Sequence, residues 1–164
     1  EDLVKLLYFL RRFQPQAQLY LIGDRWEVGY DRWVERLAAD LKVADGVTLA
    51  GKVSHIDMLT YLRAADLYVS MSEHEGFGVP LIESMLLNLP VVAFGVTAVP
   101  ETMGEAGIVF YRKDFAHLAE LVDLILADGA LRQRIIAGQR SRVQHFMEPH
   151  VRRQFLAHLE RAAS

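Results

Sequence analysis

The sequence predicts one α/β domain over residues 1–164, in which helices cover both faces of a parallel β-sheet. Short runs rich in Val, Leu and Ile alternate with longer segments whose apolar residues recur at helical spacing. Such alternation predicts three layers, because each helix returns the chain to the edge where the next strand begins. The chain has 164 residues, 52% of them hydrophobic, which is enough for a sizeable core.

The first half of the chain is predicted to contain three helices and three strands. Leu6 and Leu10 belong to one apolar face of a helix over residues 1–13. Trp33 is expected on the apolar side of the second helix, and Ser54 is a suitable N-cap for the third. The other elements expected here are helices over 30–41 and 55–64, buried parallel strands over 18–23, 47–51 and 67–71, and a loop over 24–29 that contains Trp26.

The second half is predicted to continue the same alternation and to end in helices. Asp114 is a suitable N-cap for a helix over 115–127. We expect the next helix to be interrupted near Gly138, and Pro149 to open a final helix. The elements expected are strands over 91–94 and 108–110, a short helical turn over 100–103, and helices over 115–127, 130–146 and 149–162.

The stretch from 72 to 92 organises the rest of the chain. A strand ends before it, a glycine loop follows, and Pro80 is placed at the first position of a helix. The first turn of a helix has free N–H groups and partial positive charge, and both favour phosphate. Gly76 and Gly78 should let a phosphate approach the backbone. The open donors expected are the amides of Gly78, Val79, Leu81 and Ile82.

Two carboxylates flank these donors, Glu75 before the loop and Glu83 in what should be the first helical turn. A carboxylate repels a phosphate and can only accept hydrogen bonds, so the two acids should accept from hydroxyls on ribose or another sugar. Phosphate donors between hydroxyl acceptors predict a nucleotide-sugar site. Glu83 alone would be read as an acid favoured by the helix dipole.

The segment from Glu75 to Glu83, with seven residues between the two acids, resembles the signature of retaining GT-B glycosyltransferases of family four, also called group 1. The similarity extends through 84–85, 89–93, 99–101 and 104–107. It implies a Rossmann-like fold, the C-terminal, donor-binding half of GT-B. The resemblance implies that Glu83 binds the ribose hydroxyls. It implies that Glu75 contacts the transferred sugar or the adjoining phosphate region, as the residue nearest to a catalytic one. The nucleotide-sugar-binding residues expected are Lys52, Glu75, Gly76, Phe77, Gly78, Val79, Leu81 and Glu83.

The resemblance also implies the reaction and the partners. The family moves a sugar from a UDP-, GDP- or ADP-linked donor to an acceptor glycan, lipid or small molecule, as in polysaccharide biosynthesis. It implies no cofactor or essential metal. The family's domain opens with a strand and a loop carrying an Arg and a Lys for the phosphates, and nothing here matches that segment. We therefore expect a fragment that lacks its first strand and the N-terminal acceptor domain, and that is inactive alone.

Several assignments stay open. Lys52 is equally well a surface lysine. Phe77 is either a core anchor for the loop or a wall of the sugar pocket, and its backbone N–H is expected to matter more than its ring. A catalytic His74 is disfavoured, because a loop histidine beside a charged residue is more often solvated. The alternative functions are a non-catalytic nucleotide-sugar-binding module and a nucleotide-sugar epimerase of GT-B fold. A dinucleotide fingerprint fails, since Leu81 stands where a third glycine would be required.

Charge and composition exclude other classes of protein. The net charge of −3 gives no reason to expect nucleic-acid binding. The absence of cysteine excludes disulfides and thiolate metal sites. No apolar run is long enough to span a bilayer. These observations predict a cytoplasmic location and leave open a peripheral membrane association of the full-length protein.

Overall fold

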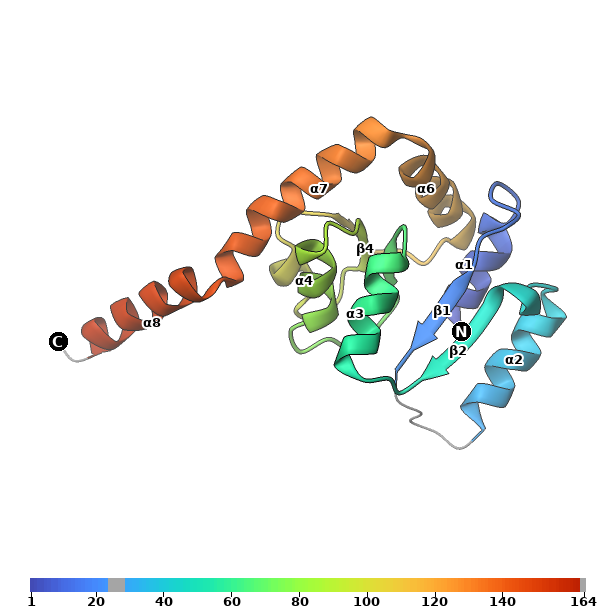
Figure 1. Cartoon of the computed structure of the whole chain (residues 1–164), viewed down its shortest axis with the longest axis horizontal. Helices are drawn as coiled ribbons and strands as arrows, with labels where there is room; N and C mark the ends of the chain where they lie inside the picture. Colours follow the sequence, from blue (N-terminus) through green and yellow to red (C-terminus); the bar gives the residue numbers. More distant parts are fainter. Residues whose placement is uncertain (24–28, 163–164) are drawn as a thin grey trace.

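The computed structural model describes residues 1–23 and 29–162, and it contains alternating helices and strands along the chain (Figure 1). Trp26 and most of the loop expected over 24–29 lie outside the described residues. The helices are α1 (Asp2–Leu10), α2 (Tyr30–Asp40), α3 (His55–Ala64), α4 (Val79–Leu86), α5 (Val99–Met103), α6 (Phe115–Ala127), α7 (Gly129–Val143) and α8 (Glu148–Ala162). The strands are β1 (Leu19–Ile22), β2 (Val47–Gly51), β3 (Tyr68–Ser70), β4 (Val91–Phe94) and β5 (Ile108–Phe110), and short 3₁₀ turns lie at Ala44–Gly46 and Gln144–Phe146.

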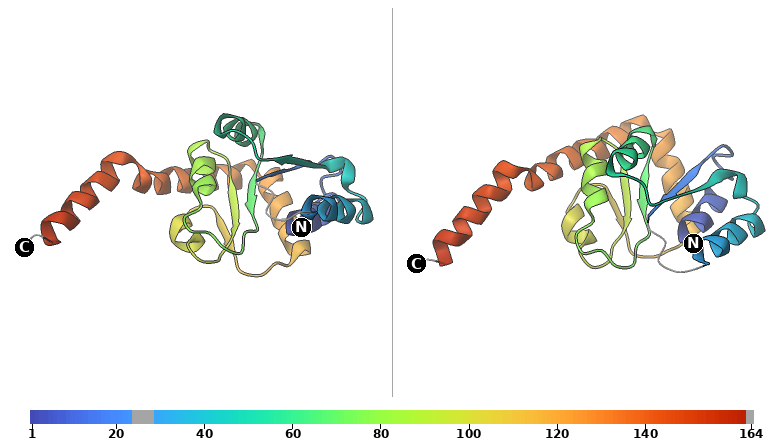
Figure 2. Two further views of the ribbon diagram at one scale, coloured as in Figure 1. Left: turned by 90° about the horizontal axis from the view of Figure 1, so that it is seen from below. Right: turned by 60° about the horizontal axis from the view of Figure 1, so that its bottom comes forward.

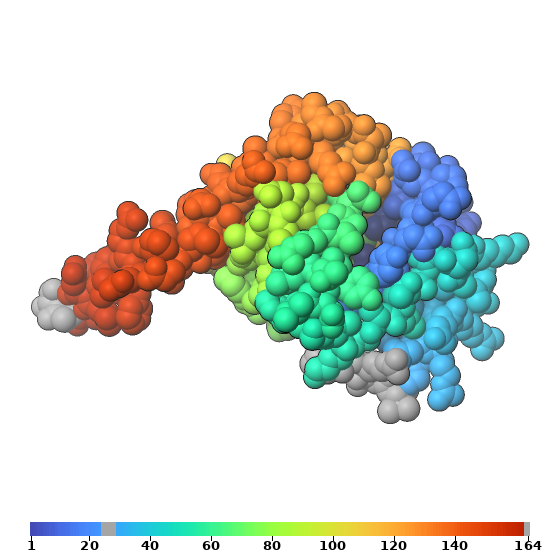
Figure 3. Space-filling view, in the orientation of Figure 1, coloured from blue at the N-terminus to red at the C-terminus, as the bar shows by residue number. Residues whose placement is uncertain are grey.

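All strand pairs are parallel, as predicted, but they form two sheets instead of one. The first sheet has the order β1-β2, and the second has the order β3-β4-β5. Within the described part of the chain β1 and β3 share no ladder, so the expectation of one continuous sheet is wrong. The space-filling view shows the surface hollowed between α3 and the segment around β1 (Figure 3). Each of the two sheets therefore has an unpaired edge at the middle of the fold.

Helices pack on both faces of β4, which confirms the predicted layers. Successive side chains of a strand point to opposite faces. Val91 and Ala93 pack with Met85 of α4, whereas Val92 packs with Val122 of α6. Figure 2 shows α3 on one side of the strands and α1 and α2 on the other. The central strand β4 is therefore buried on both faces, as strands of parallel sheets usually are.

Helix α1 joins the two sheets. Its Leu6 and Leu10 belong to the core cluster of β4, β5 and α6, whereas its Val4 and Leu7 belong to the cluster beneath α2 and β1. All four side chains are at most 9% exposed. Burying such a side chain stabilises the fold by about 1.5–3 kcal/mol. One helix thus connects two sheets between which the described residues form no ladder.

Three details differ from the sequence predictions. Strand β1 is not fully buried, because Tyr20 is 52% exposed and its ring lies against Tyr61. Trp33 is 44% exposed and packs on the ring of Tyr30, so the buried side of α2 is formed by other residues. Helix α7 continues through Gly138 without a break, because a helical glycine costs only about 1 kcal/mol and neighbouring contacts offset it.

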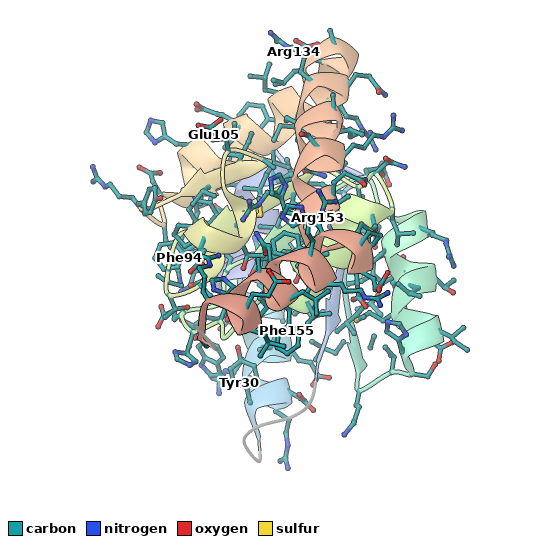
Figure 4. All side chains as sticks on the ribbon, turned by 90° about the vertical axis from the view of Figure 1, so that its left-hand side faces the viewer. Tyr30, Phe94, Glu105, Arg134, Arg153 and Phe155 are labelled. Carbon is teal, nitrogen blue, oxygen red and sulfur yellow. The ribbon has the colours of Figure 1, made fainter. Side chains whose placement is uncertain are left out.

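The last helix extends away from the body of the domain (Figure 1). Val151, Phe155 and Leu159 recur at four-residue spacing on α8, and each is about half exposed. Figure 4 shows Phe155 and Arg153 on different sides of this helix. Among the described residues, none of the helices is both long and apolar enough to cross a bilayer.

A buried glutamine fixes the start of β4. The Gln139 side chain of α7 is 0% exposed; its Oε1 accepts from the Val91 N–H at 2.9 Å, and its Nε2 donates to the Leu89 carbonyl at 2.8 Å. These two backbone groups lie on either side of Pro90, which has no N–H of its own. Gln139 therefore satisfies polar groups that would otherwise be buried without partners.

Gln139→Leu should lower the free energy of unfolding by about 2–4 kcal/mol, because it leaves one buried donor and one buried acceptor unpaired. Urea unfolding followed by circular dichroism would measure the change. Gln133→Leu is the matched control, since Gln133 is an exposed residue of the same helix. Equal stability of both variants would contradict the role given to Gln139.

Candidate functional site

A tight backbone turn connects the loop after β3 to helix α4. Gly78 is the N-cap residue and has a φ of 78°, in the left-handed region. A Cβ at this position would lie 2.6 Å from Leu81 Cδ1. A side chain is therefore excluded by both conformation and space. Gly76 differs, because the position of its absent Cβ has no atom within 4 Å.

The helix begins one residue earlier than expected. Val79 is its first residue and Pro80 its second, a shift within the usual uncertainty of helix ends. The amide of Leu81 is not an open donor, because it donates to the Gly78 carbonyl at 2.9 Å. Among the described residues, no acceptor is paired with the amides of Gly76, Phe77, Gly78 or Val79. Of the four amides predicted to be open, those of Gly78 and Val79 have no acceptor in the described part of the chain, that of Leu81 is paired, and that of Ile82 lies inside helix α4.

Two threonines after β4 hold this loop in place. The Glu75 N–H donates to Thr97 Oγ1 at 2.9 Å, and the Thr97 hydroxyl donates to the Glu75 carbonyl at 2.8 Å. Thr102 Oγ1 donates to the Phe77 carbonyl at 2.7 Å. Thr97 has a φ of 47°, which is uncommon for a branched residue. Sequence reasoning missed both threonines, because no local spacing connects them to the loop.

Glu83 is held by a histidine from another helix. His55, the first residue of α3, has Nε2 2.7 Å from Glu83 Oε1. The Glu83 side chain is 16% exposed, and its Oε2 is buried with no hydrogen-bond partner among the described residues. Glu83 is the fifth residue of α4, so the expectation that it lies in the first turn is wrong. The helix dipole therefore gives a weaker reason for an acid at this position.

Tyr68 of β3 lies near both acids and was missed by sequence reasoning. Burial of the phenol raises the pKa of Tyr68 to about 12, and the negative charges of Glu75 and Glu83 contribute in the same direction. Both carboxylates thus act on one hydroxyl. This supports the predicted convergence of the two acids, which have seven residues between them in the chain, on one region of the molecule.

The other predicted residues surround the loop to different degrees. Lys52 is exposed and directly follows β2, three residues before His55. Phe77 is 47% exposed, and its ring meets Phe146 edge to face at 5.6 Å. Val79 is 53% exposed, and His74 is also exposed. Phe77 is therefore a partly exposed side chain beside the loop, not a core anchor.

A further basic residue near this edge is already paired. Lys113 Nζ donates to Asp2 Oδ2 at 2.7 Å, to Glu73 Oε1 at 2.8 Å and to the Met71 carbonyl at 3.2 Å. It also lies 4.7 Å from the centre of the Phe94 ring. This lysine connects the start of α1 to the end of β3 and is compensated by two carboxylates. Within the described ranges no three His, Cys, Asp or Glu side chains are grouped to hold a metal ion.

The sequence matches the model of the family described as glycosyl transferases group 1 over residues 1–142. The D-inositol 3-phosphate glycosyltransferase of Stackebrandtia nassauensis is 30% identical over 142 residues, which is 83% of this chain and 32% of that protein. A mannosyltransferase of Corynebacterium glutamicum, named as GDP-mannose-dependent, is 29% identical over 88% of this chain and 39% of its own length. The chain thus spans 32–39% of the length of these two relatives.

Solved structures agree with the sequence matches. Sucrose-phosphate synthase from Thermosynechococcus elongatus superposes with a TM-score of 0.77 at 29% identity, covering 98% of this chain and 43% of that one. HepE of Anabaena, solved with UDP-glucose, superposes with a TM-score of 0.82 at 23% identity, covering 97% and 44%. The second likeness supports the fold alone. Because the family model matches 142 of the 164 residues, the chain belongs to the group 1 glycosyl transferases.

Proposed function

We propose that this chain is the donor-binding domain of a retaining GT-B glycosyltransferase, which transfers a sugar from a nucleoside diphosphate sugar to an acceptor. The observation that carries the proposal is the buried Oε2 of Glu83, four residues after the amides at 76–79; neither has a hydrogen-bond partner among the described residues. A buried acceptor without a donor costs about 1–3 kcal/mol, and a ligand hydroxyl would remove that cost. Ribose supplies such hydroxyls next to phosphates that suit the amides.

In this proposal each group of the site has a separate role. The amides of Gly76, Phe77, Gly78 and Val79 stabilise negative charge on the departing nucleoside diphosphate, a charge that grows in the transition state. Glu83 accepts from the ribose, and Glu75 orients the transferred sugar. Lys52, exposed at the end of β2, adds positive charge near the base and phosphates. The proposal requires no cofactor or resident metal ion.

The relatives leave the nucleotide base open. The Corynebacterium relative is named as GDP-mannose-dependent, whereas HepE was solved with UDP-glucose. The amides and carboxylates of the site contact phosphate and hydroxyls, which UDP, GDP and ADP share. We therefore propose a nucleoside diphosphate sugar as the ligand and treat the base, the sugar and the acceptor as measurements to be made.

The split sheet supports the proposed place of this chain in a larger protein. The unpaired edges of β1 and β3 would both be satisfied by one more parallel strand between them. We propose that such a strand, with phosphate-binding basic residues after it, belongs to polypeptide outside this sequence. The acceptor would bind to a further N-terminal domain. We expect the present chain to bind nucleotide and to transfer little or no sugar.

Glu83→Gln keeps the shape of the side chain but removes the charged acceptor. Binding of the matching nucleotide should weaken by roughly 1.5–3 kcal/mol, because a hydrogen bond to a charged group is lost. Isothermal titration calorimetry with UDP, GDP and ADP, each with and without EDTA, would measure this change. Glu105→Gln is a control, since Glu105 is an exposed acid after α5. Unchanged affinity in Glu83→Gln would remove the ribose contact.

Gly78→Ala and Gly76→Ala should act differently. Gly78→Ala should lower stability by about 1–3 kcal/mol, because it forces a side chain into a left-handed conformation and against Leu81. Gly76→Ala should leave urea unfolding unchanged but weaken nucleotide binding, since the space beside Gly76 is where phosphate would approach. Nucleotide affinity of Gly76→Ala equal to wild type would contradict phosphate contact at this residue.

Tyr68 provides a test of whether the acids converge. The pKa of Tyr68 in the folded state is raised to about 12. The stability that its neutral phenol contributes is therefore fully present below the unfolded pKa of about 10. It is lost as pH rises from about 10 to 12, by about 2–3 kcal/mol. Tyr68→Phe should reduce this alkaline loss in urea unfolding. Removing one acid charge, by Glu75→Gln or Glu83→Gln, should lower the Tyr68 pKa measured by ultraviolet phenolate titration.

A further inference from the structure

We propose that His55 is a positioning residue for Glu83, which fixes the direction of the carboxylate that accepts from the ribose hydroxyls. This inference rests on the proposed function and assigns a role to a residue outside the signature loop. His55 reaches Glu83 from a different helix, at 2.7 Å between Nε2 and Oε1. The imidazole is 65% exposed, whereas the carboxylate is 16% exposed.

The two oxygens of Glu83 have different surroundings. Oε1 is paired with His55, whereas Oε2 is buried and has no partner among the described residues. An ionised carboxylate can only accept, so the bond requires a hydrogen on His55 Nε2. Each carboxylate oxygen has two lone pairs, so Glu83 keeps acceptor capacity for ligand hydroxyls while His55 holds Oε1.

The hydrogen bond to His55 orients the Glu83 carboxylate, which packing alone does not do. A glutamate side chain has several rotamers, and ordering it costs up to about 2 kcal/mol. The nearby Tyr68 and Glu75 do not hold Glu83, since neither donates a hydrogen bond to it, and the charge of Glu75 repels it. Without His55 the Glu83 carboxylate could turn toward water. An anchored carboxylate meets the ligand already oriented, which raises affinity.

The local structure of α3 supports this role. Ser54 caps the helix by accepting from the Asp57 N–H, and this bond sets the direction of the first turn. His55 follows the cap directly and leaves the turn toward α4. The next residue, Ile56, is 75% exposed and has no side-chain part in the cap. Ile56 is therefore a matched control on the same turn.

The test compares nucleotides with and without the ribose hydroxyls. The probes are UDP, GDP and ADP, followed by the 2′-deoxy and 3′-deoxy forms of whichever binds best to the wild-type chain. His55→Ala should weaken binding of the ribonucleotide about tenfold. It should weaken binding of the 2′-deoxy and 3′-deoxy forms less, because each of them lacks a hydroxyl that Glu83 accepts. A purely structural defect would weaken all of the ligands alike.

Two further variants complete the comparison. His55→Gln keeps an N–H donor of similar reach and should restore most of the affinity. In a Glu83→Gln background, His55→Ala should have almost no additional effect, because both changes remove one interaction. Ile56→Ala should bind every ligand as the wild type does. His55→Ala should remain folded in urea unfolding, with a small loss of stability, because the Glu83 carboxylate loses its donor.

The outcomes separate this proposal from the proposed function. If the wild-type chain binds none of the three nucleotides, the donor-binding function is wrong and the role of His55 is wrong with it. If the wild type binds but His55→Ala binds equally well, only the role of His55 is overturned. Equal losses for the ribonucleotide and both deoxy forms would also overturn it. Selective loss for the ribonucleotide, restored by His55→Gln, would support it.

Discussion

The reciprocal hydrogen bonds between the Thr97 hydroxyl and the backbone of Glu75 are the constraint on which the site depends. A loop can leave its amides open for a ligand only if something else fixes its conformation. Thr97 and Thr102 provide this from the segment after β4, through the carbonyls of Glu75 and Phe77 and one amide. The donors at 76–79 thus have no partner within the described ranges, while the loop that carries them is held by side-chain hydrogen bonds. Such preorganisation lowers the cost of ordering a site when ligand binds.

The same segment after β4 depends on contacts made far away in the chain. Gln139 of α7 satisfies the backbone on both sides of Pro90 and so fixes where β4 begins. Arg142, one turn later on α7, donates to the backbone carbonyls of Glu101 and Thr102. Helix α7 therefore positions both ends of the segment that holds the signature loop. Helix α1 connects this half of the molecule to β1 and β2 through Val4 and Leu7.

The electrostatics of the site follow from burial more than from net charge. Two acids near one buried phenol would be unfavourable without a nearby donor, and Glu83 has such a donor in His55. The second carboxylate oxygen of Glu83 has no hydrogen-bond donor in the part of the chain that the structure describes. Buried polar atoms without partners are rare in proteins and are often found where a ligand binds.

The sequence by itself determined most elements and the core of the site. Apolar patterns predicted α3, β4, β5 and α6 with their observed bounds. The two helices start where expected because the caps Ser54 and Asp114 act within one turn. The nine-residue segment from Glu75 to Glu83 also indicated the family. Only the tertiary structure decided which groups complete the site. Thr97, His55 and Tyr68 reach it from other elements, and local patterns do not record contacts between residues distant in the chain. For the same reason the division into two sheets could not be read from the sequence, since strand pairing is a long-range interaction.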